Sequence, residues 1–376
     1  MLWLQVGYWA SAAVVFGIAL LLVAQALEHR RYARSRHRRV YHKDPADHVA
    51  LFVPCKGADA DLEDNLRCLF AQDHENHELV FIVESVDDEA YEPIRRLIAE
   101  YPQRRAKLIV AGMATTSGQK VHNLLVATET LPPEVRVLAF ADADIRPPSD
   151  WLRLLTQRLD PFAASSGYRW FVPKRPSLAN FLVASIDCAV VPLMFPGIHQ
   201  KIWGGSWAIR REVFESTRMR DAWRGTLSDD LVASPGVLAR AKQPIALETA
   251  CILPSPIDMD IRTTFSWVRR QLIIGRFYSP LLWAIVFVGQ GLGQAIFWGS
   301  LGAALYGLVT GASWTWQPAA VVGLLYALNV FRAWTRQRAS RLYLPHYQQA
   351  LAATRRFDVW CGPLANLALY SAMIAS

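Results

Sequence analysis

Charged side chains are absent from two long stretches of this chain. Residues 6–27 contain no acid or base, and neither do residues 277–331. An α-helix rises about 1.5 Å per residue, so even the shorter stretch is long enough to cross a hydrocarbon layer of ~30 Å. The 376 residues are 52% hydrophobic and include 14 Trp, yet 19% are charged. This balance excludes an ordinary soluble enzyme and a pure helical bundle, and it predicts a soluble domain joined to a few membrane helices.

Cysteine is scarce, and the cysteine and histidine residues are not spaced as metal ligands. The 5 Cys and 9 His lack zinc-finger spacing and the His-Glu-x-x-His pattern. An odd number of scattered cysteines is typical of a reducing compartment rather than of a disulfide framework. The chain has no RNP-like aromatic strand, so its net charge of +8 does not indicate a nucleic-acid partner. Because the basic residues cluster beside the apolar stretches, they indicate anionic lipid head groups instead.

Basic residues follow each apolar stretch. Arg30–Arg39 comes after the first stretch, whereas a cleavable signal peptide carries its positive charge before the apolar segment. We therefore expect an uncleaved anchor whose C-terminal end is cytoplasmic by the positive-inside rule. A second basic region, Arg332–Arg356, follows residues 277–331. The residues between the two apolar stretches are thus predicted to lie on the cytoplasmic side.

The second apolar stretch is interrupted near residues 310–318, where Gly311, Ser313 and Pro318 occur. This predicts a helical hairpin with one span near Leu281–Val309 and another near Ala319–Phe331. A final apolar segment starts at Val359, and it is expected either to span the membrane or to lie in its interface.

These patterns predict five segments of an integral membrane protein. The membrane is expected to be a bacterial inner membrane, or one of the ER or Golgi type in a eukaryote. The segments are an N-terminal transmembrane anchor (1–28), a cytoplasmic domain with interfacial helices (29–276), a transmembrane hairpin (277–334), a cytoplasmic basic loop (335–358) and a C-terminal transmembrane or interfacial helix (359–376).

The cytoplasmic domain begins with short apolar runs that alternate with helical stretches. The strands are predicted at 49–53, 79–83, 108–110 and 135–141, and the helices at 61–71, 88–101 and 121–130. Repeated strand–helix–strand units require right-handed crossovers and predict an α/β fold with a mostly parallel, doubly wound sheet. In such sheets ligands bind beyond the carboxyl ends of the strands.

Three polar segments follow predicted strands and are expected to line one crevice. They are Pro54-Cys55-Lys56-Gly57, Glu84-Ser85-Val86-Asp87-Asp88 and Asp142-Ala143-Asp144. Two carboxylates one residue apart at a strand end can share a Mg²⁺ or Mn²⁺ ion, especially when substrate phosphates complete its shell. Turns and helix caps are the alternative interpretation for each of these segments.

Further candidates follow along the chain. Lys120 begins a predicted helix and is a candidate for meeting a uracil or phosphate oxygen. Gly205 belongs to a glycine pair that allows a ligand to approach closely, or that simply forms a tight turn. Asp229 and Asp230 precede an apolar helical run. They are expected either to supply a general base or to cap this helix. Arg270 is expected either to neutralise a diphosphate leaving group or to be an arginine that flanks the membrane.

Together these residues resemble the membrane-embedded family 2 glycosyltransferases, which have the GT-A fold, and most of all the ceramide glucosyltransferases of family 21. The resemblance covers about Leu51–Arg276. Its elements are Pro54 to Gly57 with Asp59 beyond, Glu84 to Asp88, Asp142 to Ile145, and Asp229-Asp230. The arginine–tryptophan element departs from the family, because Trp267 and Gln271 occupy its first and last positions and only Arg270 is in register. Ser85 stands where an Asp is usual.

The resemblance implies an inverting hexosyltransferase that uses a UDP-sugar donor and Mg²⁺ or Mn²⁺. It implies that Asp144 holds the metal with help from Asp142, that Asp230 is the catalytic base, and that Arg270 stabilises the leaving group. The residues expected at the donor site are Pro54, Lys56, Gly57, Glu84, Asp87, Lys120, Asp142, Asp144, Gly205 and Asp229.

The acceptor implied by the resemblance is a membrane lipid hydroxyl, of ceramide or a related sphingolipid. Residues 177–198 are largely apolar and are interpreted as an amphipathic segment that receives the lipid, or as a buried core helix. The alternatives are a polyprenyl-phosphate sugar transferase, which uses the same donor chemistry, and a polysaccharide synthase, which needs more spans. A non-enzymatic transporter is disfavoured because residues 277–331 contain no acidic or basic side chain.

Overall fold

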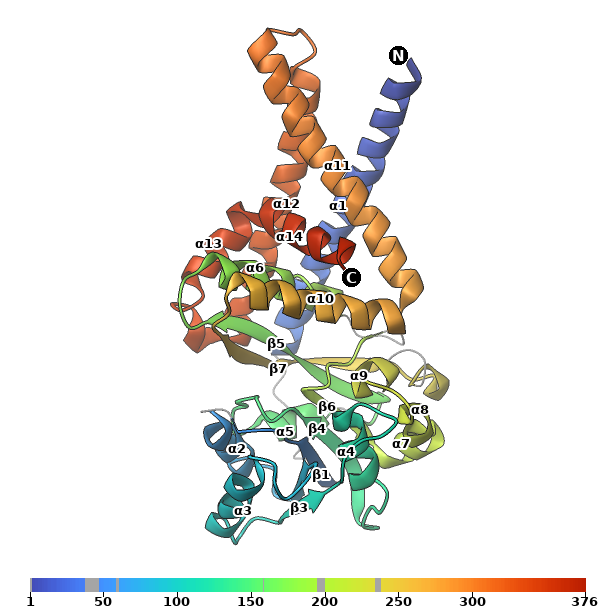
Figure 1. Cartoon of the computed structure of the whole chain (residues 1–376), viewed down its shortest axis with the longest axis vertical. Coiled ribbons are helices and arrows are strands. Elements are labelled where there is room, and N and C mark those ends of the chain that lie inside the picture. Colours follow the sequence, from blue (N-terminus) through green and yellow to red (C-terminus); the bar gives the residue numbers. More distant parts are fainter. Residues whose placement is uncertain (1, 38–46, 59–60, 158, 195–199, 234–237) are drawn as a thin grey trace. The chain divides into compact units, whose positions relative to one another are not determined.

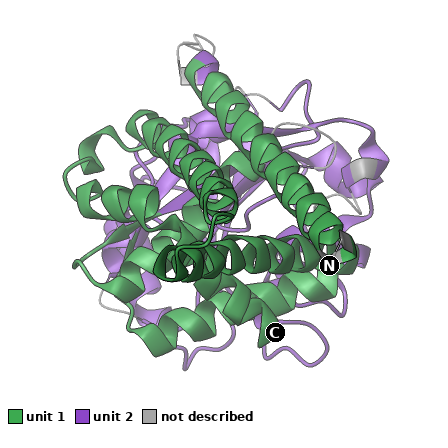
Figure 2. Cartoon of the chain, turned by 90° about the horizontal axis from the view of Figure 1, so that it is seen from above, with its two compact units in different colours: residues 1–34, 171–193, 256–376 green, residues 35–170, 194–255 purple. Residues whose placement is uncertain are grey.

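The computed structural model describes all residues except 1, 38–46, 59–60, 158, 195–199 and 234–237 (Figure 1). The chain forms two compact units, which are coloured separately in Figure 2. We call residues 35–170 and 194–255 the sheet unit, and residues 1–34, 171–193 and 256–376 the helical unit. Each unit is described by itself.

The sheet has seven strands in the order β3-β2-β1-β4-β6-β5-β7. β1, β2, β3 and β4 are parallel, as the sequence predicts, and β6 is antiparallel to both β4 and β5. The strands are β1 (His48–Pro54), β2 (His77–Val83), β3 (Ala106–Val110), β4 (Val135–Ala141), β5 (Ala164–Pro173), β6 (Ser206–Arg210) and β7 (Ile245–Ile257). The prediction of a mostly parallel α/β sheet is therefore confirmed.

Helices cover both faces of this sheet because β1, β2 and β4 are apolar on both sides. In β1, Leu51 packs into one core together with α2, α3 and α5, whereas Phe52 packs into the other core with α4, α7 and α8. Two-sided burial is typical of parallel sheets, whose crossover helices lie on the faces. The helices are α2 (Leu62–Phe70), α3 (Tyr91–Glu100), α4 (Gln119–Ala127), α5 (Trp151–Thr156), α7 (Arg211–Ser216), α8 (Met219–Trp223) and α9 (Asp229–Val232), with the 3₁₀ turn η3 (Ala239–Ala241).

The reversed direction of β6 shapes the edge of the sheet where a ligand is expected. Ser206, at the start of β6, pairs with Ala141, at the end of β4. The chain immediately before β6 therefore lies beside the residues that follow β4. This brings the glycine pair 204–205 to the same edge as Asp142, and the amide of Asp142 donates to the carbonyl of Gly205 at 3.4 Å.

The helical unit contains two helices that are long and apolar enough to cross a membrane, Gln5–Arg36 and Pro280–Thr310. The first belongs to α1 (Leu2–His37) and the second is α11 (Pro280–Thr310). Ala12 and Val15 of α1 pack with Ile296 of α11 and with Leu325 of α12 (Trp316–Tyr343). Length and composition agree with the predicted anchor and with the first helix of the predicted hairpin.

The rest of the hairpin and the C-terminal segment differ in detail from the predicted segments. α12 does follow α11 and contacts it, but its basic second half makes it less apolar than a complete span, and its crossing stays a prediction. The final apolar segment contains the end of α13 (Ala352–Trp360), whose first residues belong to the predicted basic loop, and all of α14 (Gly362–Ile374). At 1.5 Å per residue, α14 is about 20 Å long. That length is too short for a span and favours the interfacial alternative.

The segment predicted to receive the lipid begins as α6 (Leu178–Cys188), whose first turn is capped when the Ser177 side chain accepts from the Asn180 amide. α6 packs against α10 (Ile261–Tyr278), α13 and α14 within the helical unit. It is thus a helix of that unit in which most side chains are buried, and its role in receiving a lipid stays a prediction. It is followed by the 3₁₀ turn η1 (Val191–Leu193), and a second such turn, η4 (Pro345–Tyr347), follows α12. Residues 195–198 of the predicted segment lie outside the described residues.

Candidate active site

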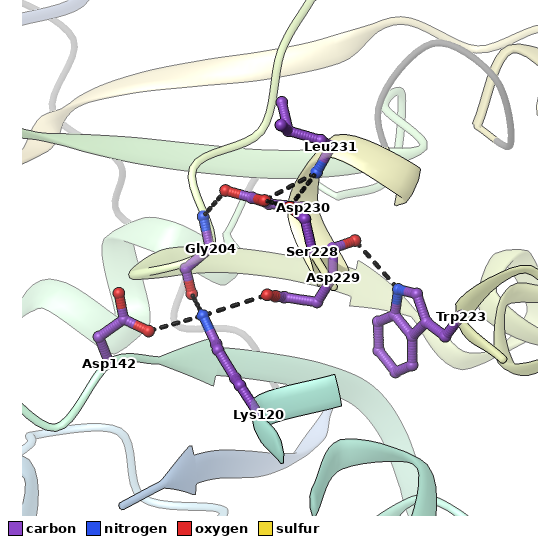
Figure 3. Close-up of polar contacts among 8 residues, drawn as sticks. All are labelled: Lys120, Asp142, Gly204, Trp223, Ser228, Asp229, Asp230 and Leu231. Carbon is purple, nitrogen blue, oxygen red and sulfur yellow. Dashed lines mark hydrogen bonds and ion pairs between the residues drawn. The ribbon is translucent and has the colours of Figure 1, made fainter. Parts of the chain in front are cut away.

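Lys120 lies at the centre of a charged cluster in the sheet unit (Figure 3). Its Nζ atom is 2.6 Å from Oδ1 of Asp142 and 3.2 Å from Oδ1 of Asp229, and it donates to the carbonyl of Gly204 at 3.3 Å. The three partners come from the end of β4, the start of α9 and the turn before β6. One ammonium group therefore joins three segments that are far apart in the sequence.

The electrostatic balance of this cluster is uneven. Burial by itself would lower the pKa of Lys120, but the charges of Asp142, Asp229 and Asp230 outweigh it and keep the pKa above its usual value. Burial raises the pKa of Asp229 to about 6, although the neighbouring Lys120 counteracts this rise. Asp230 has a second cation nearby, because its charge also acts on Lys201, whose pKa burial lowers.

Asp230 is held by donors at the start of α9. Its Oδ2 accepts from the amide of Gly204 at 2.8 Å, and its Oδ1 accepts from the amide of Leu231 at 2.7 Å and from the hydroxyl of Ser228. Ser228 also caps α9. The indole of Trp223 donates to the carbonyl of Asp229 at 3.0 Å and supports the same turn from within the core. The carboxylate is thereby fixed in place and half-buried.

Glycine is required beside this cluster by close contacts. A Cβ atom at position 204 would lie 2.9 Å from Nζ of Lys120 and 3.2 Å from both carboxylate oxygens of Asp229. A Cβ at Gly205 would overlap the indole of Trp203. Gly204 therefore lets the Lys120 and Asp229 side chains approach the backbone, whereas Gly205 packs on Trp203 in a tight turn that the amide of Ser206 closes by donating to the carbonyl of Trp203 at 3.1 Å.

Asp144 lies two positions after Asp142, just beyond the end of β4. Its side chain is exposed and lines a small hollow with six other residues, namely Ile145, Arg169, Trp203, Leu253, Pro254 and Ser255. The guanidinium of Arg169 lies 5.8 Å from the centre of the Trp203 ring in that hollow. Sequence analysis missed Arg169 and Trp203, and the only available signal was the position of Trp203 directly before the glycine pair.

Asp142 and Asp144 offer few ligands to a divalent ion. Within the described part of the chain, no group of three or more His, Cys, Asp or Glu side chains gathers in a metal-binding arrangement. Mg²⁺ is often held by only one or two carboxylates while phosphates and water complete its shell. Asp142 and Asp144 therefore fit an ion that arrives with a diphosphate, and they do not fit one that the protein holds permanently.

The turns after β1 and β2 are joined to each other at the same edge of the sheet. Nζ of Lys56 is 2.9 Å from Oε2 of Glu84, and the amide of Gly57 donates to Oδ1 of Asp88 at 2.9 Å. Gly57 has a φ of 68°, a conformation that favours glycine. Pro54, which ends β1, directs the chain into this turn.

Among the remaining candidates, Asp87 is exposed in the turn after β2. Asp88, by contrast, fastens the two turns, because it also accepts from the amide of Ala90 at 2.9 Å. Arg270 is exposed on α10 in the helical unit, so its role stays a prediction. Asp59 lies outside the described residues.

Replacing Lys120 with Met is expected to destabilise the protein by roughly 1–3 kcal/mol, because Asp142 would lose its ion-pair partner and the buried Asp229 would lose the positive charge that favours its ionised form. Thermal unfolding followed by intrinsic fluorescence would measure this as a melting temperature lowered by several degrees. Lys107→Met is the matched control, since Lys107 pairs with Glu78 at 3.5 Å on β3, away from the cluster. Equal stability of the two variants would contradict the role of Lys120 as the shared counter-ion.

A family model described as glycosyl transferase family 21 matches residues 11–351. The chain belongs to glycosyltransferase family 21. The match includes the sheet unit with all of its candidate site residues, together with α11 and α12 of the helical unit. The resemblance inferred from the sequence motifs is thus confirmed at the level of the family.

Two curated relatives from Caenorhabditis elegans match shorter parts of the chain. Ceramide glucosyltransferase 3 is 30% identical over 119 residues, which are 31% of this chain and 26% of that protein. Ceramide glucosyltransferase 1 is 33% identical over 93 residues, which are 24% of this chain and 20% of that protein. The aligned parts therefore span about a quarter or less of these relatives.

A solved structure supports the fold class. It is the mannosyltransferase PcManGT from Pyrobaculum calidifontis in complex with GDP-Man and Mn²⁺. The TM-score is 0.50 at 16% sequence identity, and the superposition covers 92% of this chain and 99% of the other. At this identity the similarity establishes a shared glycosyltransferase fold.

Proposed function

We propose that this protein is an inverting glycosyltransferase that moves a hexose from a UDP-sugar to the hydroxyl of a membrane lipid, ceramide or a related sphingolipid. The observation that carries the proposal is the fixed, half-buried Asp230 beside the Lys120–Asp142–Asp229 cluster at the ligand-binding edge of an α/β sheet. Membership of family 21 and the names of the curated relatives support the reaction type and the acceptor class.

The donor is proposed to lie over the carboxyl ends of β1, β2 and β4. The turns with Lys56 and Glu84 flank this edge, and the open space beside Gly57 permits close approach of a nucleotide. Asp144 and Asp142 would hold Mg²⁺ or Mn²⁺ together with the donor diphosphate. When bound, such an ion offsets the negative charge of that diphosphate.

The transfer is a single displacement at the anomeric carbon. The lipid oxygen forms a bond to this carbon as the bond to the UDP oxygen breaks, and UDP leaves with the bonding electrons. Asp230 accepts the proton of the lipid hydroxyl. Arg270 stabilises the charge that develops on the departing diphosphate. Attack from the face opposite the leaving group inverts the anomeric configuration.

Membrane attachment through α1 and α11 supports a lipid acceptor. Both helices have the length and composition of membrane spans. A lipid that stays in the bilayer can present its hydroxyl only to a site close to the membrane surface, so an anchored enzyme suits such an acceptor.

Two experiments test this proposal. Mass spectrometry of lipids from cells with and without the chain should reveal a hexosylated lipid that depends on it. The purified protein, given UDP-glucose or UDP-galactose with either ceramide or a polyprenyl phosphate, should glycosylate ceramide. Transfer to the polyprenyl phosphate alone would assign the protein to the alternative acceptor class, and formation of a polymer would indicate a polysaccharide synthase.

Arg270→Gln is expected to lower kcat/KM roughly 10²-fold or more, because the leaving diphosphate loses a planar cationic donor. Arg269→Gln is the matched control, since Arg269 precedes it on α10 and its Nε donates to the carbonyl of Ala375 at 2.6 Å. Steady-state kinetics with released UDP as the readout would separate the two. Similar losses in both variants would assign Arg270 a membrane-flanking role.

A further inference from the structure

The basic ends of two apolar helices meet in the helical unit. The apolar part of α1 ends at Leu27, and that of α12 ends at Phe331. Just beyond these points, Nε2 of His29 is 2.5 Å from the hydroxyl of Tyr343, although the two residues are 314 positions apart. The guanidinium of Arg30 lies 5.9 Å from the ring centre of Trp334. The points where the apolar parts of α1 and α12 end are far apart in the sequence but lie close together in space.

A second guanidinium lies over the same ring. Arg338 is 4.1 Å from the ring centre of Trp334. The two distances place the guanidinium groups within roughly 10 Å of each other, about one Debye length at 0.1 M salt. Trp334 is 39% exposed and stacks with the exposed Phe331. Tryptophan in such a position is typical of the head-group level of a membrane.

The charges of this group are not balanced by acids. Among the residues that the structure describes, no carboxylate forms an ion pair with Arg30 or Arg338. Other arginines of the same helices do have acidic partners, since Arg31 pairs with Glu28 at 3.5 Å and Arg336 with Asp358 at 2.6 Å. Positive charge therefore exceeds negative charge around Trp334, where Arg34 adds a further positive charge close to Arg30.

We propose that Arg30, Arg338 and Trp334 form a binding site for the phosphate group of an anionic membrane phospholipid. Guanidinium groups donate paired hydrogen bonds to phosphate oxygens. The Trp334 ring offers an apolar surface at the depth where the acyl chains begin. A lipid suits the site better than a free anion, because Phe331 and Leu27, on the apolar side of the site, are also exposed.

This inference rests on the membrane attachment proposed above, but it is independent of sugar transfer. It concerns residues of the helical unit, whereas Asp230 and the Lys120 cluster belong to the sheet unit. The bound lipid would hold the ends of α1 and α12 together at the membrane surface.

Native mass spectrometry of the full-length purified protein tests the site. The protein is supplied with equal concentrations of phosphatidylglycerol and phosphatidylcholine, and the bound lipids are counted. The wild type is expected to retain phosphatidylglycerol with a preference of roughly tenfold or more, since each arginine near an anionic head group contributes about fivefold. The double variant Arg30→Gln/Arg338→Gln is expected to lose most of this preference.

The matched control is Arg31→Gln/Arg341→Gln, which removes two positive charges from the same two helices. Equal loss of preference in both double variants, or no preference in the wild type, would overturn the site. Displacement of the lipid by an equal concentration of inorganic phosphate would also overturn it, because the site would then take a free anion. Unchanged thermal unfolding of the variants confirms that they fold.

Two further measurements separate this inference from the proposed function. Failure of the protein to float with phosphatidylcholine vesicles would contradict membrane attachment itself. Flotation without a preference for phosphatidylglycerol would contradict only the head-group site. Selective binding of phosphatidylglycerol without sugar transfer would contradict only the proposed reaction.

Discussion

Asp230→Asn is expected to reduce sugar transfer by roughly 10³-fold or more while the donor still binds. The amide cannot accept the proton of the attacking hydroxyl, and general base catalysis typically contributes 10²–10⁴-fold. Asn keeps the size of Asp and retains one oxygen that can accept from the amide of Gly204, so the turn before β6 should remain in place. Initial rates of lipid hexosylation and calorimetric binding of UDP would be measured on the same preparation.

The matched control for this variant is Asp221→Asn. Asp221 lies on the nearby helix α8 and forms a surface ion pair with Arg218 at 2.9 Å. Exposed pairs of this kind contribute little to stability, so transfer should remain close to that of the wild type. Loss of UDP binding in Asp230→Asn would contradict its assignment as the base and would favour a role in holding the donor.

Removal of the divalent ion is expected to stop transfer, and Asp144→Asn is expected to have nearly the same effect, with a loss of roughly 10³-fold. Without the ion, the negative charge of the departing diphosphate is not offset, and metal ions contribute several kcal/mol in such steps. The exposed carboxylate of Asp144 is free of the Lys120 ion pair that engages Asp142, so it is the more accessible ligand. Rates would be measured after EDTA treatment and again after addition of Mn²⁺.

Binding measurements give the second readout for Asp144. Calorimetry with the intact UDP-sugar should show tighter binding in Mn²⁺ than in EDTA for the wild type and a much smaller difference for Asp144→Asn. Asp73→Asn is the matched control, because Asp73 is partly exposed in the same unit and pairs with Arg153 at 3.3 Å. Undiminished sugar transfer after EDTA treatment would contradict the metal-binding role of Asp142 and Asp144.

The strands and most helices of the sheet unit could be predicted because their signals are local. The apolar run Val135–Ala141 is a strand with those bounds, and the predicted helix 61–71 corresponds to α2. Apolar spacing and strand length fix such elements without knowledge of distant residues. The predicted helix 88–101 begins later, at Tyr91, because Asp88 stays in the turn and bonds Gly57 and Ala90.

The candidate site was predicted only in part. The rule that ligands bind at the carboxyl ends of parallel strands grouped the turns after β1, β2 and β4 correctly at one edge. This rule could not predict that the turn before β6 and the Arg169 side chain also lie at that edge. Both depend on strands that depart from the parallel pattern, since β6 runs antiparallel to β4 and to β5.

The sequence by itself determined the family motifs, the α/β pattern and the two apolar helices of membrane length, because each depends on residues that are close together in the chain. Only the tertiary structure decided that Lys120 neutralises Asp142 and Asp229, that Gly204 donates to Asp230, and that Arg30 meets Trp334. Lys120 and Gly204 are 84 positions apart. Contacts over such separations are set by the order and direction of strands and by helix packing, which no local pattern of residues specifies.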